Sequence, residues 1–212
     1  MLKMQFITEQ AVLAYIEEQK IRQSKKYLTY SEREQLKKMI ENPKNYITIA
    51  TPQIPENVKP IIRNIKQLKI PCQPVVIGED ISQIVKELKA TLEYSGGIGL
   101  SANQIGYNKQ ISYIKVFKGY NKETKKIDMV ELLLINPKII EHERRYVVRQ
   151  EGCLSLQGRV DTDRWVFITL VNYDKNLKPI TTCYQDYTAL AIQHEVDHQR
   201  GKTIYDRKHK KR

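Results

Sequence analysis

The 212-residue sequence has little of what disulfide scaffolds and membrane spans require. Its three cysteines, Cys72, Cys153 and Cys183, are odd in number and show no paired spacing. This excludes a disulfide framework and indicates a reducing compartment, where thiols stay free for metal binding or chemistry. No apolar run approaches the roughly 20 residues of a membrane helix, and residues 1–10 lack the features of a secretory signal. We therefore expect a cytoplasmic protein with no membrane association.

Acidic residues are scarce relative to basic ones. Lysine and arginine total 36 against 24 aspartates and glutamates, which gives a net charge of +12. Such a charge suits an acidic partner such as RNA or the ribosome. The lysines are spread along the chain, as is usual for solubility, and only residues 207–212 form a dense basic block. We predict a disordered basic tail there, the ribosome as a candidate partner, and no binding to DNA.

Histidine is also rare, with four in the chain, yet two of them share one H-E-x-x-H segment at residues 194–198. In a helix this spacing carries His194 and His198 to one face, where both imidazoles can bind one metal ion. Glu195 can then act as a general base on a water molecule at the metal. The alternative is two helical histidines with solvated tips, which chance rarely places around a glutamate at this spacing.

Two histidines leave a tetrahedral metal ion short of one protein ligand and keep one position open. Cys153 is a candidate for the missing thiolate, although a buried, inert thiol is the usual state of a cysteine beside glycine at a strand end. On chemistry alone, Cys72 and Cys183 compete for this role.

The apolar periodicity predicts helices over residues 9–27, 31–42 and 58–68, and a clearer one that follows Asp80 and ends at Gly96. Residues 97–104 follow. Their small side chains would let the backbone approach a ligand closely, but composition alone favours a flexible loop.

Strand patterns follow without any βαβ alternation, and a last helix spans about residues 186–200. We predict an α+β fold in which antiparallel sheets pack around this long central metal-binding helix. The domains would be a helical N-terminal extension over 1–68, a catalytic domain over 69–206 and the basic tail over 207–212. The strand patterns cover residues 111–117, 131–140 with a break at Asn136 and Pro137, 144–149, 165–173 and 178–182.

Three segments stand in the order of the three motifs of peptide deformylases and closely resemble them. These enzymes remove the formyl group from the N-terminal methionine of nascent chains. The resemblance also takes in residues 134–137 and covers residues 70–206. The three segments are Gly97-Ile98-Gly99-Leu100-Ser101-Ala102-Asn103-Gln104, Glu151-Gly152-Cys153-Leu154-Ser155 and Gln193-His194-Glu195-Val196-Asp197-His198.

The resemblance implies a metal-dependent hydrolase in which Glu195 is the general acid and base. The side-chain amide of Gln104 and the backbone N–H of Leu154 would stabilise the oxyanion that forms at the formyl group. The implied metal is ferrous iron, and zinc, nickel or cobalt can occupy the site in the family. The implied metal ligands are Cys153, His194 and His198.

The implied substrates are N-formyl-methionyl nascent peptides, whose backbone would pair with residues 97–99, including Gly99, as an added strand. Arg159 matches a position that contacts substrate carbonyl groups, although the segment before it is one residue shorter than usual. Arg164 and Asp197 are expected to pair and orient the helix. Candidates for the methionine pocket, with ordinary core packing as an equal alternative, are Ile98, Tyr187, Leu190 and Ala191.

Three residues depart from the family pattern near the site, and one of them, Tyr187, is bulkier than the usual aliphatic residue and would narrow the methionine pocket. Ser101 stands where many members have alanine, and Gln199 replaces the leucine that usually follows the last ligand. We expect Gln199 to loosen the packing there.

Two other functions compete with deformylation. A zinc peptidase of the H-E-x-x-H type is disfavoured by the cysteine motif, because such peptidases usually use Glu or His as the third ligand. A ribosome- or RNA-associated protein with a vestigial metal site is disfavoured because Glu195 and Gln104 are both intact.

Overall fold

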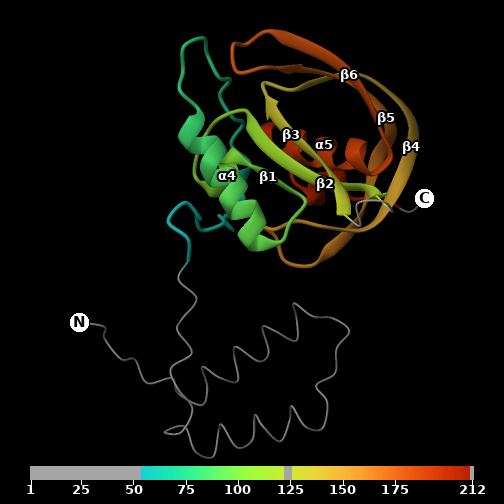
Figure 1. The fold of residues 1–212 in the computed structure, drawn as a ribbon. Helices are drawn as coiled ribbons and strands as arrows, with labels where there is room; N and C mark the ends of the chain where they lie inside the picture. Colours follow the sequence, from blue (N-terminus) through green and yellow to red (C-terminus); the bar gives the residue numbers. More distant parts are fainter. Residues whose placement is uncertain (1–53, 122–125, 211–212) are drawn as a thin grey trace, which may run out of the picture. The chain divides into compact units, whose positions relative to one another are not determined.

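The structure, a computed structural model, describes residues 54–121 and 126–210 (Figure 1). The unit that it describes begins at Ile54, so the helices predicted over residues 9–27 and 31–42 lie outside the described residues. The described elements are α3 (Ile65–Leu68), α4 (Ser82–Ser95), β1 (Gly99–Ser101), η2 (Ala102–Ile105), β2 (Ile111–Asn121), β3 (Lys126–Ile135), β4 (Lys138–Gly152), β5 (Arg159–Tyr173), β6 (Pro179–Gln185), α5 (Asp186–Gln199) and η3 (Ile204–Arg207).

The strands form two three-stranded antiparallel sheets, so the predicted combination of helices with antiparallel sheets is present. In one sheet β2 lies between β1 and β3, and in the other β5 lies between β4 and β6. The predicted break is confirmed, because β3 ends at Ile135 and β4 begins at Lys138. Between them the side chain of Asn136 bonds both the N–H and the C=O of Val75, at 2.8 and 2.9 Å.

Helix α5 lies between the two sheets (Figure 1). Its residue Ile192 is fully buried in one apolar cluster with Ile114 of β2 and Leu170 of β5, so both sheets hold the helix. Burial of side chains of this size contributes about 1.5–3 kcal/mol each. The helix is therefore a rigid support for His194 and His198, which lie near the end of β4.

Helix α4 buries Leu88 and Leu92 in a cluster with residues of β1 and β2, and it ends at Gly96, whose φ of 67° is left-handed. The flexible loop favoured for residues 97–104 is wrong, because β1 and the 3₁₀-helix η2 occupy this segment. Ser101 and Gln104 form a capping box that begins η2. The small residues thus build an ordered strand and turn.

Two other predictions of local structure need correction. Of the helix predicted over Val58 to Leu68, only α3 is helical, because Pro60 disfavours helix in the residue before it and Asn64 caps the shorter helix with its side chain. Residues 144–149 are no separate strand but part of the long β4, which continues through irregular pairing with β5.

The disordered tail predicted from residue 207 is also wrong for its first residues. Arg207 ends η3, Lys208 forms a bridge with Thr162 of β5, and the N–H of His209 donates to the C=O of Asp161 at 2.7 Å. Pairing with β5 and contacts with the buried Asp197 and the partly buried Asp163 order this part of the basic block. Among the described residues, no helix is long and apolar enough to cross a membrane.

Candidate active site

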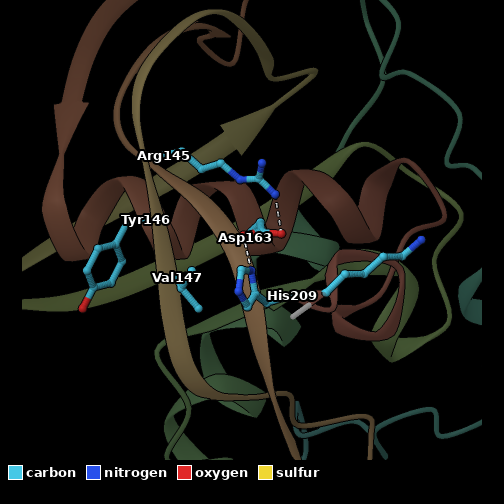
Figure 2. Close-up of a pocket in the computed structure, with 6 residues that line it drawn as sticks. Arg145, Tyr146, Val147, Asp163 and His209 are labelled. Carbon is cyan, nitrogen blue, oxygen red and sulfur yellow. Dashed lines mark hydrogen bonds and ion pairs between the residues drawn. The ribbon is translucent and has the colours of Figure 1, made fainter. Parts of the chain in front are cut away.

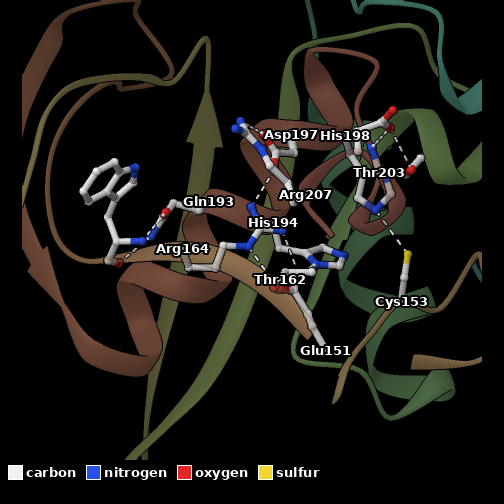
Figure 3. Close-up of polar contacts among 12 residues, drawn as sticks. Glu151, Cys153, Thr162, Arg164, Gln193, His194, Asp197, His198, Thr203 and Arg207 are labelled. Carbon is white, nitrogen blue, oxygen red and sulfur yellow. Dashed lines mark hydrogen bonds and ion pairs between the residues drawn. The ribbon is translucent and has the colours of Figure 1, made fainter. Parts of the chain in front are cut away.

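The structure brings Cys153, His194 and His198 together, with their donor atoms all within 4.8 Å of one another. Cys153 follows the last residue of β4, and the two histidines stand one turn apart on α5 with ring centroids separated by 5.0 Å. The Sγ of Cys153 lies 3.2 Å from Nε2 of His198 (Figure 3). Such a compact group of one sulfur and two nitrogens has the ligand types that a single divalent transition metal binds.

The other two cysteines do not join this group. Cys72 is buried elsewhere, and burial raises the pKa of its thiol to about 11, which makes it inert. Cys183 is exposed on β6. Of the three cysteines, only Cys153 lies close enough to His194 and His198 to be the third metal ligand within the described residues.

The two histidines differ in their protonation. Burial lowers the pKa of His194, but hydrogen bonds with Cys153 and Glu151 outweigh it and raise the pKa to about 10. A metal ion would have to displace a proton from this group, because only the deprotonated nitrogen binds a metal. Burial, together with the charges of His194 and Arg164, lowers the pKa of His198 well below its usual value. His198 is thus neutral, as metal binding requires.

Glu151 contacts the ring of His194 at Nδ1. Its Oε1 lies 2.6 Å from Nδ1 of His194, which leaves Nε2 for the side facing Cys153. Burial alone would raise the pKa of Glu151, but hydrogen bonds with His194 and Arg164 lower it well below its usual range. Thr162 also donates to Glu151. A carboxylate that accepts the second N–H of a ligand histidine fixes its tautomer and orientation.

Glu195 is buried beside the cluster, and its Oε2 has no hydrogen-bond partner among the described residues. Burial raises the pKa of this carboxyl to about 7, with the charge of His194 opposing the rise. An unpaired carboxyl with a pKa near neutrality suits a group that exchanges protons during turnover.

Gly99 of β1 lies directly against Glu195. A Cβ atom built on Gly99 would be 2.9 Å from Cδ and 3.1 Å from Cγ of Glu195, closer than side-chain carbons pack. Glycine at this position is therefore required by the approach of the strand to the carboxyl group and not by its backbone conformation.

The side-chain amide of Gln104 is oriented by hydrogen bonds at both ends. The N–H of Ser101 donates to Oε1 at 2.8 Å, so the NH₂ group must face the other way, where it donates to Oγ of Ser155 at 3.0 Å. Nε2 also lies 3.7 Å from Sγ of Cys153. Leu154 follows in the turn and packs its side chain against Gly97. The NH₂ group of Gln104 is thus held beside Cys153, one of the three clustered donors.

The residues predicted to contact the peptide lie in different environments. Ile98 and Tyr187 are exposed, Leu190 is half-buried, and Ala191 belongs to the core cluster around α5. Arg159, the first residue of β5, is exposed and donates from Nη1 to the C=O of Gln150 at 3.1 Å. In the part of the chain that the structure describes, β1 is an edge strand of its sheet with β2 as its partner, and an edge strand can pair with an added strand.

The expectation that Gln199 loosens the packing is wrong. Gln199 is buried and donates from Nε2 to Oγ of Ser112 at 2.7 Å, and Ser112 donates in turn to Oγ of Ser101 at 2.9 Å. Asn103 donates to the C=O of His198 at 2.9 Å. These bonds tie the C-terminal turn of α5 to β1, β2 and η2 through buried side chains.

Several residues of this region carry contacts that sequence reasoning missed. Gln193 bonds both the N–H and the C=O of Trp165 on β5, at 2.9 and 2.7 Å. Arg207 binds Asp197 with two nitrogens (Figure 3). The expected contact between Arg164 and Asp197 is present. The only sequence signal for Arg207 was its charge, which the neighbouring basic residues share.

Comparison with known proteins identifies relatives of this chain. The family model described as polypeptide deformylase matches residues 58–212. A peptide deformylase of Synechocystis sp. is 33% identical over 144 residues, which cover 67% of this chain and 74% of that protein. One of Mycoplasma genitalium is 37% identical over 149 residues, covering 62% and 72%.

Solved structures share the fold. PDF from the Vibrio parahaemolyticus bacteriophage VP16T, in complex with actinonin, is 33% identical with a TM-score of 0.57, and the match covers 68% of this chain and 98% of that one. A Met-Ala-Ser-bound peptide deformylase from Acinetobacter baumannii is 24% identical with a TM-score of 0.60, covering 71% and 98%.

Proposed function

Because this chain belongs to the polypeptide deformylase family, we propose that Cys153, His194 and His198 hold its metal ion and that Glu195 moves the proton in deformylation. The enzyme removes the formyl group from the N-terminal formyl-methionine of nascent polypeptides and releases formate. The observation that carries the assignment is the meeting of one thiol and two imidazoles within 4.8 Å, with the unpaired carboxyl of Glu195 beside them.

The donor set suits a divalent ion such as ferrous iron, our first choice, or zinc, nickel or cobalt. When bound, such an ion polarises a carbonyl oxygen and lowers the pKa of a water molecule. Glu151 keeps the ring of His194 oriented toward the donor group, and the neutral His198 completes it.

Glu195 performs the proton transfers. Its carboxylate accepts a proton from the water molecule that attacks the formyl carbon. It then returns the proton to the amine nitrogen as the bond between carbon and nitrogen breaks, so that formate and a free N-terminus leave. A pKa of about 7 makes both transfers possible near neutral pH, because neither protonation state is strongly favoured. Gly99 keeps the carboxyl from being displaced by a side chain of β1.

Gln104 and Leu154 supply donors to the oxygen on which negative charge develops. The amide of Gln104 is held with its NH₂ group toward Cys153, and this orientation exists before any substrate arrives. The backbone N–H of Leu154 is the second proposed donor. Donors fixed in advance stabilise a transition state without reorganising during the reaction.

The peptide backbone binds along the open side of β1, at Ile98 and Gly99, and continues toward Arg159. The exposed side chains of Ile98 and Tyr187 and the half-buried Leu190 offer apolar surface to methionine. The burial of Ala191 in the core leaves it as a backing residue behind Leu190. A strand added to an edge gains affinity from main-chain hydrogen bonds, which suits substrates of varied sequence.

The zinc peptidase alternative is disfavoured by the site itself, because the third donor beside the two histidines is Cys153. A vestigial site in a ribosome-associated protein is disfavoured by the family assignment and by the held amide of Gln104.

The function is tested by formate release from a formyl-methionyl tripeptide, with protein purified without oxygen and its metal content measured on the same sample. We expect turnover with about one metal per chain. The Glu195→Gln variant should keep the metal and lose turnover. Actinonin, with which the phage neighbour was solved, should compete with the peptide. Full metal occupancy in the unaltered protein without any formate release would refute the proposal.

Association with the ribosome is a separate proposal, supported by the net charge of +12. A cavity of about 390 Å³ lies where β4 and β5 meet the C-terminal residues, with Arg145 and Lys210 on its wall (Figure 2). Arg145 and His209 both bind Asp163, at 2.6 and 2.9 Å, so Lys210 is the cation without a carboxylate partner among the described contacts. Co-sedimentation with ribosomes should fall steeply as salt increases, and no association at low salt would remove this proposal.

A further inference from the structure

The last described segment of the chain is joined to the metal-binding helix through Asp197. The carboxylate of Asp197 is buried, with 4% of its side chain exposed, and lies between the two proposed ligands in sequence. Arg207 of η3 donates to it twice, from Nε to Oδ2 at 2.9 Å and from Nη2 to Oδ1 at 2.7 Å. A two-pronged contact of this kind fixes direction as well as distance.

The same carboxylate is shared with Arg164, which extends the contacts to the site. Arg164 is 2% exposed and donates from Nη1 to Asp197. Its other two nitrogens donate to Glu151, from Nε to Oε2 at 3.0 Å and from Nη2 to Oε1 at 2.7 Å. Glu151 in turn holds His194. An unbroken series of charged contacts therefore runs from Arg207 to a proposed metal ligand (Figure 3).

The charges along this series alternate. Two guanidinium groups, Arg164 and Arg207, face two carboxylates, Glu151 and Asp197, in a region where the inner three groups have 2–12% of their side chains exposed. Without Arg207 the buried Asp197 would keep only one of its two guanidinium partners. Arg164 would then be drawn toward an Asp197 that has lost its second partner, because an uncompensated buried charge is costly.

The position of Arg207 is itself secured by the fold. Ile204 of the same turn is fully buried against Leu68 and Leu156, and Cys153 packs on this cluster. Asp206 closes a capping box with Thr203 and forms an ion pair with Lys69 at 2.9 Å. The turn is thus anchored independently of Asp197, so the guanidinium group approaches Asp197 from a fixed support.

We propose that Arg207 is a positioning residue of the metal site, which fixes the Arg164 and Glu151 pair and thereby the ring of His194. It contacts neither substrate nor metal and acts through Asp197. The inference rests on the proposed function, because it requires that His194 binds a metal ion. Outer contacts of this type change metal affinity by about 10–100-fold when they are removed.

The test compares three variants of the full chain loaded with Co²⁺, with the affinity for Co²⁺ measured by competition with a chelator. Arg207→Met removes the charge and the two donors but keeps much of the volume. Arg207→Lys keeps the charge but cannot donate to both oxygens of Asp197 as the planar guanidinium group does. Lys69→Met is the matched control, because it breaks the other polar anchor of the same turn without touching Asp197.

We expect Arg207→Met to lower the affinity about 10–100-fold and Arg207→Lys by a smaller factor of at least about threefold. The visible absorption of bound Co²⁺ should change in both, and Lys69→Met should stay within about twofold of the parent with an unaltered spectrum. If Arg207→Met fails to fold, Arg207→Lys decides. Parental affinity and spectrum in the folded Arg207 variants would overturn the inference, whereas failure of the parent itself to bind Co²⁺ would refute the proposed metal site and the inference with it.

Discussion

Replacing Gly99 by alanine should disable the enzyme through one added methyl group. The new Cβ would meet Cδ of Glu195 at 2.9 Å and Cγ at 3.1 Å, whereas carbon atoms pack at about 3.5–4.0 Å. The carboxyl group must therefore move by about 0.5–1 Å, or β1 must move away from α5. Overpacking of this kind costs about 1–3 kcal/mol of stability, and a displacement of about 1 Å at a reacting group costs about 100-fold in rate. We expect kcat/KM to fall by about two orders of magnitude.

The assay is formate release under the conditions used for the parent, with thermal unfolding measured alongside. Gly152→Ala serves as the control, because its Cβ would lie 3.4 Å from the nearest atoms of Arg159, an ordinary contact. The control should unfold within a few degrees of the parent and keep the metal. Equal activity of Gly99→Ala and the parent would refute the reasoning, since it would mean that the Glu195 carboxyl need not lie against β1.

Four further predictions concern the same site. Glu195→Gln should lower kcat by about 10²–10⁴ while metal analysis still finds the metal, because the proton transfer is lost and the ligands are not. In the parent, kcat/KM should decline about tenfold per unit as the pH falls below about 7, since the base form of Glu195 disappears there; a decline that begins only near 4.5 would contradict the raised pKa. Gln104→Ala should lower kcat about 10²–10³-fold with little change in KM, measured by steady-state kinetics. Cys153→Ser should abolish tight metal binding, whereas Cys72→Ser and Cys183→Ser should retain it.

Much of the site could be predicted because its key spacing is local. His194 and His198 lie one helical turn apart, so their convergence follows from helix geometry as soon as the segment is helical. Choosing Cys153 over the other cysteines needed either the resemblance to a family or the tertiary structure, since the end of β4 and the turn of α5 are distant in sequence.

The predictions that failed for Gln199 and Arg207 concerned side chains whose contacts form only in the folded chain. In the sequence Gln199 is a polar residue at a position where the family has an apolar one, and its hydrogen-bond partner Ser112 lies 87 residues away. Arg207 looks like one more solvated cation because the sequence does not show that Asp197, ten residues before it, is buried in the folded chain. The helix predicted over residues 58–68 was wrong for a local reason. Pro60 disfavours helix, and this effect outweighed the apolar spacing that predicted one.

The hydrogen-bonded series of Gln199, Ser112 and Ser101 makes the choice of residue at each of these three positions depend on the other two. Leucine at residue 199 alone would remove the donor to Oγ of Ser112, and alanine at residue 101 alone would remove the acceptor of the Ser112 hydroxyl. Each of these single replacements should therefore lower the stability of the protein. Chains of this kind should therefore exchange the three residues together, and a hybrid built from two homologues should fail where the series is split.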